Sequence, residues 1–301
     1  MELVVEAEGV VLPASLDLPM GHARAAVVAL HGAEAGQRSF FLYEHLASLL
    51  PAAEIGVLRY DRRPAKDGND VPLAVQAADA YAAVQALRRQ IGDVPIGLWG
   101  FSQGAWAATV AASTKPDEVA FLVLVSSCGV SPAHQMRFGT AEQLRRHGFD
   151  PAAVAELIHL RTTVEEYLRG DVPRATAQTA VDHAAERPWF PLAYIRRQLP
   201  ERSGTWADMD FDPTSAIAGL PCPVLLFYGE TDEWMPIDDS IAAWRHAYAT
   251  KNNPDLTICR LPGCGHQPTL NESPSLAAIS PRYTSTMLAW FDRQLSGLST
   301  T

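Results

Sequence analysis

The feature that most restricts the fold is a set of short, continuous apolar runs spread along the chain. They lie at residues 25–30, 55–60, 119–125 and 224–228, and such runs are typical of strands buried on both faces. Segments with helical spacing separate them, including a long alanine-rich helix expected at 72–90. Strands that alternate with helices predict an α/β protein with a mostly parallel sheet, covered by helices on both faces.

Weaker patterns complete this sheet to about eight strands. Further strands are expected at 3–6, 10–16, 95–99 and 256–261, and further helices at 40–50, 102–112, 237–250 and 275–295. Between 128 and 216 no core strand is predicted. Helical patterns there fall at 141–146, 151–168, 174–185 and 192–199. We therefore expect a core at 1–127 and 217–301, interrupted by a mainly helical cap insertion at 128–216.

Composition narrows the function classes. The chain has 301 residues, 48% hydrophobic and 19% charged, with a net charge of −10, which is an ordinary globular mixture. No basic run of the kind that neutralises phosphates is present, so nucleic acid is not an expected partner. The chain start does not resemble a signal peptide, and no apolar run reaches membrane-spanning length. We expect a cytoplasmic protein without a membrane contact; a homodimer stays open.

The sharpest local motif is Gly100-Phe101-Ser102-Gln103-Gly104. It follows the strand expected at 95–99 and begins the helix expected at 102–112, which is the setting of a nucleophile elbow. Small residues two positions to either side leave room for a tight turn that exposes the serine hydroxyl. The alternative interpretation is a serine that only caps an ordinary helix.

A nucleophilic serine needs a base, and the base needs an acid to orient it. In this arrangement the chain order is serine, acid, histidine. Asp232 follows the strand at 224–228, and His266 lies in a glycine-rich loop after the strand at 256–261. We predict a triad of Ser102, Asp232 and His266. The alternatives are other acids, another base and another nucleophile: Glu230, Glu233, Asp238, Asp239, His31 and Cys264.

Acyl transfer also needs N–H donors where the carbonyl oxygen becomes negative. The first candidate is the backbone N–H of Gln103, directly after the serine. The second is the backbone N–H of Ala33, which follows His31-Gly32 at the end of the strand at 25–30. Gly32 allows a close approach of the backbone, and His31 is expected to brace the loop.

Substrate contacts are predicted less sharply. Trp234 stands beside Asp232 and can face the pocket. Trp189 and Phe190, which share the insertion with Tyr194 and Trp206, either form an apolar wall for an acyl group or pack the insertion onto the core. Arg38, shortly after the loop at His31, either contacts a substrate carboxylate or forms a surface salt bridge.

Together, His31-Gly32, the Gly100–Gly104 motif, Gly229–Asp232 with Pro236, and Gly265-His266 resemble the α/β-hydrolase superfamily. The early motifs are similar to bacterial esterases related to dienelactone hydrolases and prolyl-oligopeptidase-like enzymes. The resemblance implies the α/β-hydrolase fold, the triad above, and an oxyanion hole from Ala33 and Gln103. The chain departs from dienelactone hydrolases proper in having a serine instead of a cysteine nucleophile.

The expected activity is therefore that of a serine hydrolase acting on a small-molecule carboxylic ester, without a metal or an organic cofactor. The same triad also serves thioester or amide hydrolysis and acyl transfer. A lyase and a ligand-binding member of the fold remain alternatives; an intact triad argues against both.

Overall fold

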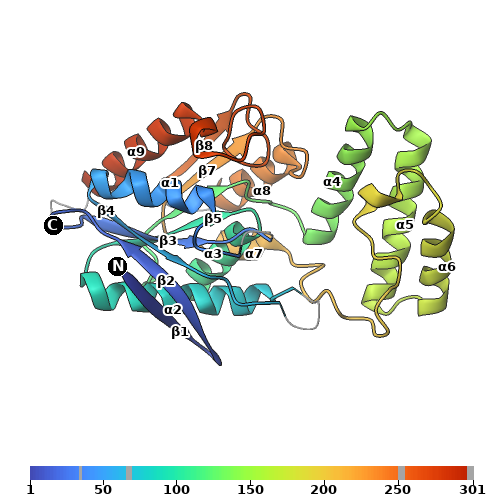
Figure 1. The fold of residues 1–301 in the computed structure, drawn as a ribbon, viewed down its shortest axis with the longest axis horizontal. Helices are drawn as coiled ribbons and strands as arrows, with labels where there is room; N and C mark the ends of the chain where they lie inside the picture. Colours follow the sequence, from blue (N-terminus) through green and yellow to red (C-terminus); the bar gives the residue numbers. More distant parts are fainter. Residues whose placement is uncertain (34–35, 66–69, 250–254, 297–301) are drawn as a thin grey trace.

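The computed structural model describes residues 1–33, 36–65, 70–249 and 255–296. Eight strands form one sheet in the order β1-β2-β4-β3-β5-β6-β7-β8 (Figure 1). β1 and β2 run antiparallel to their neighbours, and the remaining strands are parallel. This confirms the mostly parallel sheet that the sequence predicts. The strands are β1 Glu2–Ala7, β2 Val10–Asp17, β3 Ala25–Leu30, β4 Ile55–Tyr60, β5 Ile96–Phe101, β6 Leu122–Val125, β7 Val224–Gly229 and β8 Leu256–Leu261.

Helices cover both faces of the sheet (Figure 1). The α-helices are α1 Phe41–Leu49, α2 Leu73–Ile91, α3 Gln103–Thr114, α4 Pro132–Arg146, α5 Pro151–Arg169, α6 Arg174–Ala184, α7 Pro213–Gly219, α8 Ile237–Ala249 and α9 Pro281–Ser296. Three short 3-10 helices are η1 Leu50–Ala53, η2 Phe190–Ala193 and η3 Leu276–Ala278.

Strand β3 shows why these apolar runs become central strands. Its even-numbered residues, such as Val28, pack in the cluster with α2, α3 and α8. Its odd-numbered residues, such as Val27, pack in the cluster with α1 and α9. Successive strand side chains point to opposite faces, so a strand covered on both sides must be apolar throughout. Burying each such valine or leucine contributes about 1.5–3 kcal/mol.

The chain between β6 and β7 forms a separate layer, which we call the helical insertion and which the sequence predicts at residues 128–216. Its helices α4, α5 and α6 stand beside the sheet and not against its faces (Figure 1). They pack around a hydrophobic cluster of their own, which includes Leu144, Leu157 and Val181. The proposed end at 216/217 falls inside α7, whose Ile217 packs with the sheet cluster.

The structure differs from the sequence prediction mainly in this insertion. The helix expected at 192–199 is wrong: only η2 forms, and it ends at Tyr194, which has φ of +52°. α4 begins earlier than expected, at Pro132, because Ser131 caps it through the backbone N–H of His134. α7 was not predicted.

Within the core the differences are smaller. The strand expected at 119–125 begins only at Leu122. Val119 and Phe121 are buried as well, but they precede the strand. The last helix begins at Pro281 instead of 275, after η3. The expected end of α8 at residue 250 lies outside the described residues. None of the helices in the described ranges is long and apolar enough to span a membrane.

Candidate active site

Ser102 occupies a strained turn between β5 and α3. Its φ and ψ are +53° and −116°, in a region that non-glycine residues adopt at an energetic cost. The backbone N–H of Ser102 donates to the carbonyl of Val125 at 2.9 Å. A side chain at Gly104 would place Cβ 2.6 Å from the carbonyl oxygens of Leu30 and His31, and one at Gly100 would meet the Gly104 carbonyl oxygen at 2.6 Å. The two glycines therefore make the turn possible.

His266 joins the serine to the acid. Its Nδ1 lies 2.9 Å from Asp232 Oδ2 and 3.1 Å from Oδ1, and its Nε2 lies 3.0 Å from Ser102 Oγ. An ionised carboxylate only accepts hydrogen bonds, so Nδ1 carries the proton and donates it. Nε2 is then free to accept the hydroxyl proton of Ser102. The structure thus brings together the three side chains that the sequence predicts as a triad.

The loops after β7 and β8 are packed against each other, which holds the acid beside the histidine. A Cβ at Gly229 would lie 2.0 Å from the carbonyl oxygen of Gly265, so only glycine fits where the loops touch. The backbone N–H and the hydroxyl of Thr231 donate to the Cys264 carbonyl at 3.0 and 2.9 Å. Ser126, at the end of β6, donates from its hydroxyl to the carbonyl of His266 at 2.8 Å.

Asp232 is held as a carboxylate. Its side chain is fully buried, which by itself opposes ionisation. The charge of His266, the hydrogen bond from it and the backbone N–H of Trp234 outweigh burial, so the pKa of Asp232 lies below its ordinary value. Oδ1 also accepts from the backbone N–H groups of Trp234 and Met235 at 2.8 and 3.2 Å. An ionised Asp232 orients the imidazole and stabilises its protonated form.

The alternative groups have other surroundings. Glu230 and Asp239 are exposed; Glu233 pairs with Arg146 at 3.4 Å, and Asp238 pairs with Arg260. Cys264 is buried and burial raises the pKa of its thiol, which disfavours the nucleophilic thiolate.

His31 has a structural role in this arrangement. Its Nε2–H donates to the carbonyl of Tyr60 at 2.5 Å. Burial lowers the pKa of His31 to about 4, so the ring stays neutral and braces the loop after β3.

Both candidate oxyanion donors line the same cleft as the nucleophile. Ala33 and Gln103 border it beside Ser102. Gln103 is the first residue of α3, where backbone N–H groups are unpaired and the helix dipole favours negative charge. Gly32 passes close to the Phe101 ring: a Cβ there would lie 2.9 Å from ring carbon Cδ1.

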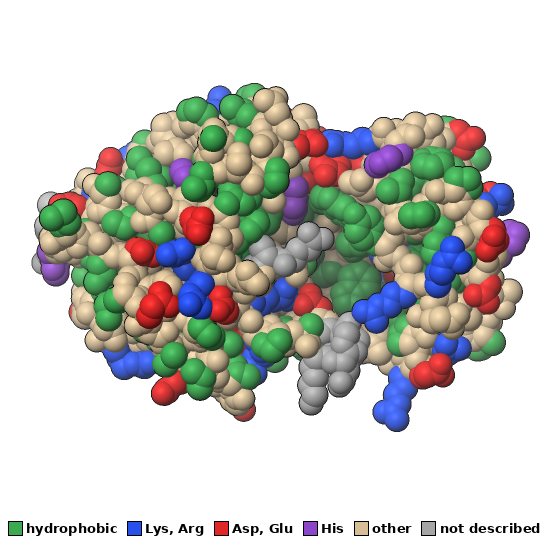
Figure 2. Space-filling model, viewed as in Figure 1, with side chains coloured by type: hydrophobic (Ala, Val, Ile, Leu, Met, Phe, Trp, Pro, Cys, Tyr) green, Lys and Arg blue, Asp and Glu red, His purple; other side chains and the backbone are tan. Residues whose placement is uncertain are grey.

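The cleft has a volume of about 960 Å³ and lies between the sheet core and the helical insertion. Hydrophobic side chains gather where the surface is hollowed between these two parts (Figure 2). Its aromatic lining residues are Phe40, Phe101, Trp106, Tyr194, Trp206 and Trp234. Among the described lining residues, Arg63 alone carries a permanent positive charge, and two of its nitrogens are bonded to Asp79 at 2.6 and 2.9 Å.

The structure corrects three predicted substrate contacts. Trp189 and Phe190 do not line the cleft; they are 3% and 5% exposed and belong to the hydrophobic cluster of the insertion. Arg38 also lies outside the lining, because its guanidinium pairs with Asp61 at 2.6 Å and with Glu2 at 2.9 Å. Packing and salt bridging are therefore their roles.

Trp234 does border the cleft, and its ring packs edge-on against Tyr194 with centroids 5.0 Å apart. Trp106 was missed by the sequence analysis. It lies four residues after Ser102, one helical turn along α3, and that spacing places it on the same side of the helix.

Polar contacts join the insertion to the core at the rim of the cleft, among them a bond from Gln135 Nε2 to the Trp234 carbonyl at 2.8 Å. At the end of α4, Arg146 donates to the Thr231 carbonyl and pairs with Glu233 and Glu272 at 3.4 and 3.1 Å. Asp208 accepts from the backbone N–H of Leu73, the first residue of α2, at 2.8 Å. The acid-bearing loop and α2 are thus tied directly to the insertion.

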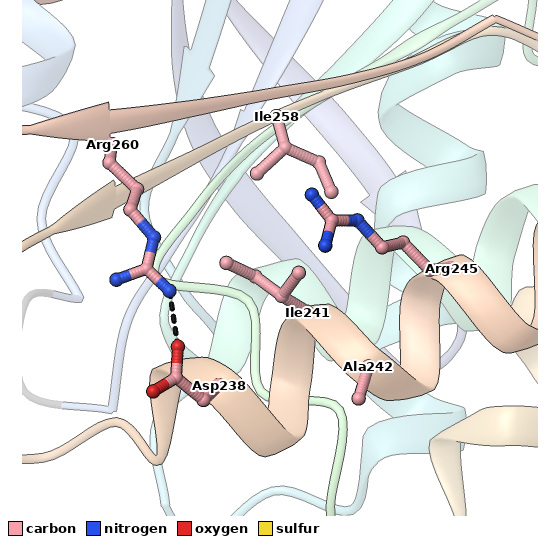
Figure 3. A pocket seen from close by; sticks show the side chains of 6 residues that line it. All are labelled: Asp238, Ile241, Ala242, Arg245, Ile258 and Arg260. Carbon is pink, nitrogen blue, oxygen red and sulfur yellow. Dashed lines mark hydrogen bonds and ion pairs between the residues drawn. The ribbon is translucent and has the colours of Figure 1, made fainter.

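A second cavity of about 490 Å³ lies between α8 and β8 (Figure 3). Its lining consists of Asp238, Ile241, Ala242, Arg245, Ile258 and Arg260. None of these side chains is a nucleophile or a histidine, so this cavity cannot carry acyl transfer. In the part of the chain that the structure describes, no cluster of three or more His, Cys, Asp and Glu side chains is suited to a metal ion.

Comparisons with known proteins agree with this fold. The sequence pattern of the alpha/beta hydrolase family matches residues 27–278. No curated protein matches the chain. Among solved structures, proline iminopeptidase from Mycobacterium smegmatis is 15% identical, with 99% of this chain and 100% of that chain covered and a TM-score of 0.61.

Two further structures are similar to the same extent. An esterase from Pyrococcus furiosus is 14% identical, with 97% and 90% covered and a TM-score of 0.63. A dienelactone hydrolase from Anabaena variabilis is 16% identical, with 97% and 96% covered and a TM-score of 0.57. At such identities these likenesses show the fold alone.

Proposed function

Because this chain belongs to the alpha/beta hydrolase family, we propose that it is a serine hydrolase that cleaves a carboxylic ester through an acyl-enzyme on Ser102. The observation that carries the proposal is the pair of hydrogen bonds made by His266, one to Ser102 Oγ at 3.0 Å and one to Asp232 at 2.9 Å. A nucleophile, a base and an orienting acid in contact are what acyl transfer requires.

In the first half of the reaction, His266 Nε2 takes the hydroxyl proton of Ser102 while Oγ attacks the ester carbonyl. The imidazole becomes positively charged, and the buried Asp232 carboxylate stabilises that charge. The carbonyl oxygen becomes negative and is stabilised by the backbone N–H groups of Ala33 and Gln103. Loss of one such donor typically lowers kcat by about 10²- to 10³-fold.

The second half reverses these roles. His266 gives the proton to the departing alkoxide, and the alcohol leaves. Water then enters, loses a proton to His266 and attacks the acyl-enzyme. The bond between the acyl carbon and Ser102 Oγ breaks, His266 returns the proton to Oγ, and the carboxylic acid leaves. The chemistry needs no group beyond those described.

The lining of the cleft supports an uncharged ester with a bulky apolar or aromatic group. Six aromatic side chains face it, and its one described guanidinium, on Arg63, is neutralised by Asp79. Asp70 is likewise paired, with Arg62, and Asp208 adds negative charge, so a carboxylate on the substrate meets no unpaired cation there. Since the helical insertion forms one wall of the cleft, we propose that it acts as a cap that selects the substrate.

The proposal is tested by treating the purified protein with a fluorophosphonate and recording the intact mass. Such a reagent reacts with a serine whose base and oxyanion donors are assembled. We expect one adduct on the parent protein and none on Ser102→Ala or His266→Ala. Labelling that persists in Ser102→Ala, or a folded parent that stays unlabelled, would contradict the proposal.

A substrate panel then tests the bond and the group. Matched esters, thioesters and amides of one aryl acid are compared, together with an ester of the same size that carries a second, ionised carboxylate. We expect the highest kcat/KM for the neutral aryl ester. A preference for the thioester or the amide would retain the triad but replace the proposed substrate.

A further inference from the structure

One guanidinium group connects the two chain segments that carry the proposed oxyanion donors. Arg62 follows β4, and its Nη1 donates to the Ala33 carbonyl at 2.9 Å. Its Nη2 donates to Gln103 Oε1 at 2.7 Å, across a sequence separation of 41 residues. The side chain of Arg62 is 10% exposed, so the guanidinium itself is largely buried, while its bond to the Ala33 carbonyl lies at the surface.

Asp70 closes a ring of side chains around this guanidinium. Arg62 Nη2 donates to Asp70 Oδ1 at 2.5 Å, and Gln103 Nε2 donates to Asp70 Oδ2, also at 2.5 Å. Oδ1 further accepts from the backbone N–H of Val71 at 2.8 Å. Arg62, Gln103 and Asp70 therefore bond one another pairwise. Bonds to charged groups are the stronger class, and a shared ring makes each of them harder to break alone.

The position of this ring matters because an oxyanion hole depends on distance. Its N–H donors must lie about 2.7–3.1 Å from the negative oxygen. Here the Ala33 donor follows β3, and the Gln103 donor begins α3 after the neighbouring strand β5; strand pairing ends at Leu30 and Gly100. Beyond the strands, Gly104 packs against the carbonyls of Leu30 and His31, and the planar guanidinium of Arg62 adds bonds to both segments, which the shorter, single-point ammonium of lysine cannot make in the same way.

On the basis of the proposed function, we propose that Arg62 is a positioning residue of the oxyanion hole. It bonds the Ala33 carbonyl and the Gln103 side chain, and so sets the separation of the two donors. Asp70 holds the guanidinium and the amide in register. Arg62 acts through the two loops and not on the substrate.

The test compares Arg62→Lys with Arg59→Lys. Arg59 lies in β4, three residues before Arg62, is 14% exposed and donates to Asp17 Oδ2 from two nitrogens at 2.9 and 3.1 Å. Its Nη1 also donates to the Arg38 carbonyl at 3.1 Å, so it is a partly buried, multiply bonded arginine outside the cleft lining. We expect Arg62→Lys to lower kcat about 10- to 100-fold and to lower the fluorophosphonate labelling rate in parallel. KM should change by less than about twofold, and the pH at half-maximal kcat/KM should shift by less than about 0.3 units, because Asp232 and His266 keep their contacts.

A second variant keeps the test decisive if Arg62→Lys folds poorly. Gln103→Met removes both side-chain bonds of Gln103 to the ring at nearly constant volume and leaves its backbone N–H in place. We expect a fall in kcat of similar size. In the double variant the two effects should not multiply, because both changes break the same ring.

The outcomes separate the two proposals. If the parent is not labelled, the proposed function fails. If the parent is labelled but Arg62→Lys is no slower than Arg59→Lys, the positioning role is overturned while the function stands. A change confined to KM, a shifted pH profile, or fully multiplicative effects in the double variant would likewise overturn it.

Discussion

The sheet core and the helical insertion place their functional residues by different means. In the core, the backbone decides: Ser102 has φ of +53°, and Gly100, Gly104 and Gly229 stand where a Cβ would collide with main-chain atoms. In the insertion, side-chain packing decides. Trp189 is buried, whereas Tyr194, five residues later, is 57% exposed and faces the cleft.

This difference indicates which parts of the protein tolerate amino-acid substitution. A position fixed by main-chain geometry admits one residue type, and its loss disturbs the reaction itself. A position fixed by packing of helices can change while the core chemistry continues. Variants in each region test this contrast.

The largest effect is expected in the core, for Asp232→Asn. The amide keeps the volume but presents an N–H to His266, which favours the wrong tautomer of the imidazole. We expect kcat to fall about 10⁴-fold, measured with the aryl ester at saturating concentration. A fall of less than tenfold would show that another acid orients His266.

Gly104→Ala tests the main-chain constraint directly. Its Cβ would lie 2.6 Å from two carbonyl oxygens, so the elbow must shift, at about 1–3 kcal/mol of unfolding free energy. Gly21→Ala is the matched control, since a Cβ there meets no atom within 4 Å. Denaturant unfolding measures the free energy of unfolding of both variants. Equal values would show that the turn at Ser102 does not require glycine at position 104.

A smaller effect is expected in the insertion, for Tyr194→Ala. Loss of a cleft-facing ring should raise KM for a bulky aryl ester about tenfold, from the apolar area no longer covered, with kcat nearly unchanged. Tyr81→Ala on α2 makes the same substitution outside the cleft lining. Steady-state kinetics on aryl and acetyl esters provide the comparison; an equal rise for the acetyl ester would argue against a wall for the bulky group.

The smallest effect concerns pH, and it has opposite signs in the two regions. Burial raises the pKa of Glu165, in α5, above its ordinary value although Arg137 pairs with it at 2.7 Å. A raised carboxyl pKa means that folding stability falls as pH rises from 4.5 through the folded-state pKa. The pKa of Asp232 is lowered, so its contribution is present above 3.8 and is lost as pH falls through its folded-state pKa.

We therefore expect Glu165→Gln to gain stability relative to the parent as pH rises above 4.5, in denaturant unfolding at a series of pH values. The informative quantity is the slope of this difference, because loss of the Arg137 pair changes its level at every pH. A flat difference across pH 4–8 would mean that Glu165 titrates normally.

The same contrast explains what the sequence could predict. Each catalytic motif directly follows a predicted strand, and the glycines of the elbow specify its main-chain geometry. Ser102, Asp232 and His266 could therefore be located from the sequence. All three then meet because parallel strands end at the same edge of the sheet.

Features that depend on distance in space could not be read in this way. The ring of Arg62, Asp70 and Gln103 joins two residues of the segment between β4 and α2 to the first residue of α3, and no local pattern marks it. In the insertion, helical spacing continued through 192–199, but Tyr194 adopts the left-handed conformation and ends η2. The periodicity of the sequence does not reveal that turn.

The shared lining of the cleft has a thermodynamic consequence. Met136 comes from the insertion and Trp234 from the core, so a molecule seated between them is bound only while both parts are folded and joined. Its binding free energy then opposes the separation or unfolding of either part. At a free concentration of 100 times Kd, this linkage adds about 2.7 kcal/mol to the stability of the folded state. Resistance to heat and to proteolysis should therefore rise with the level of the protein's own substrate or product.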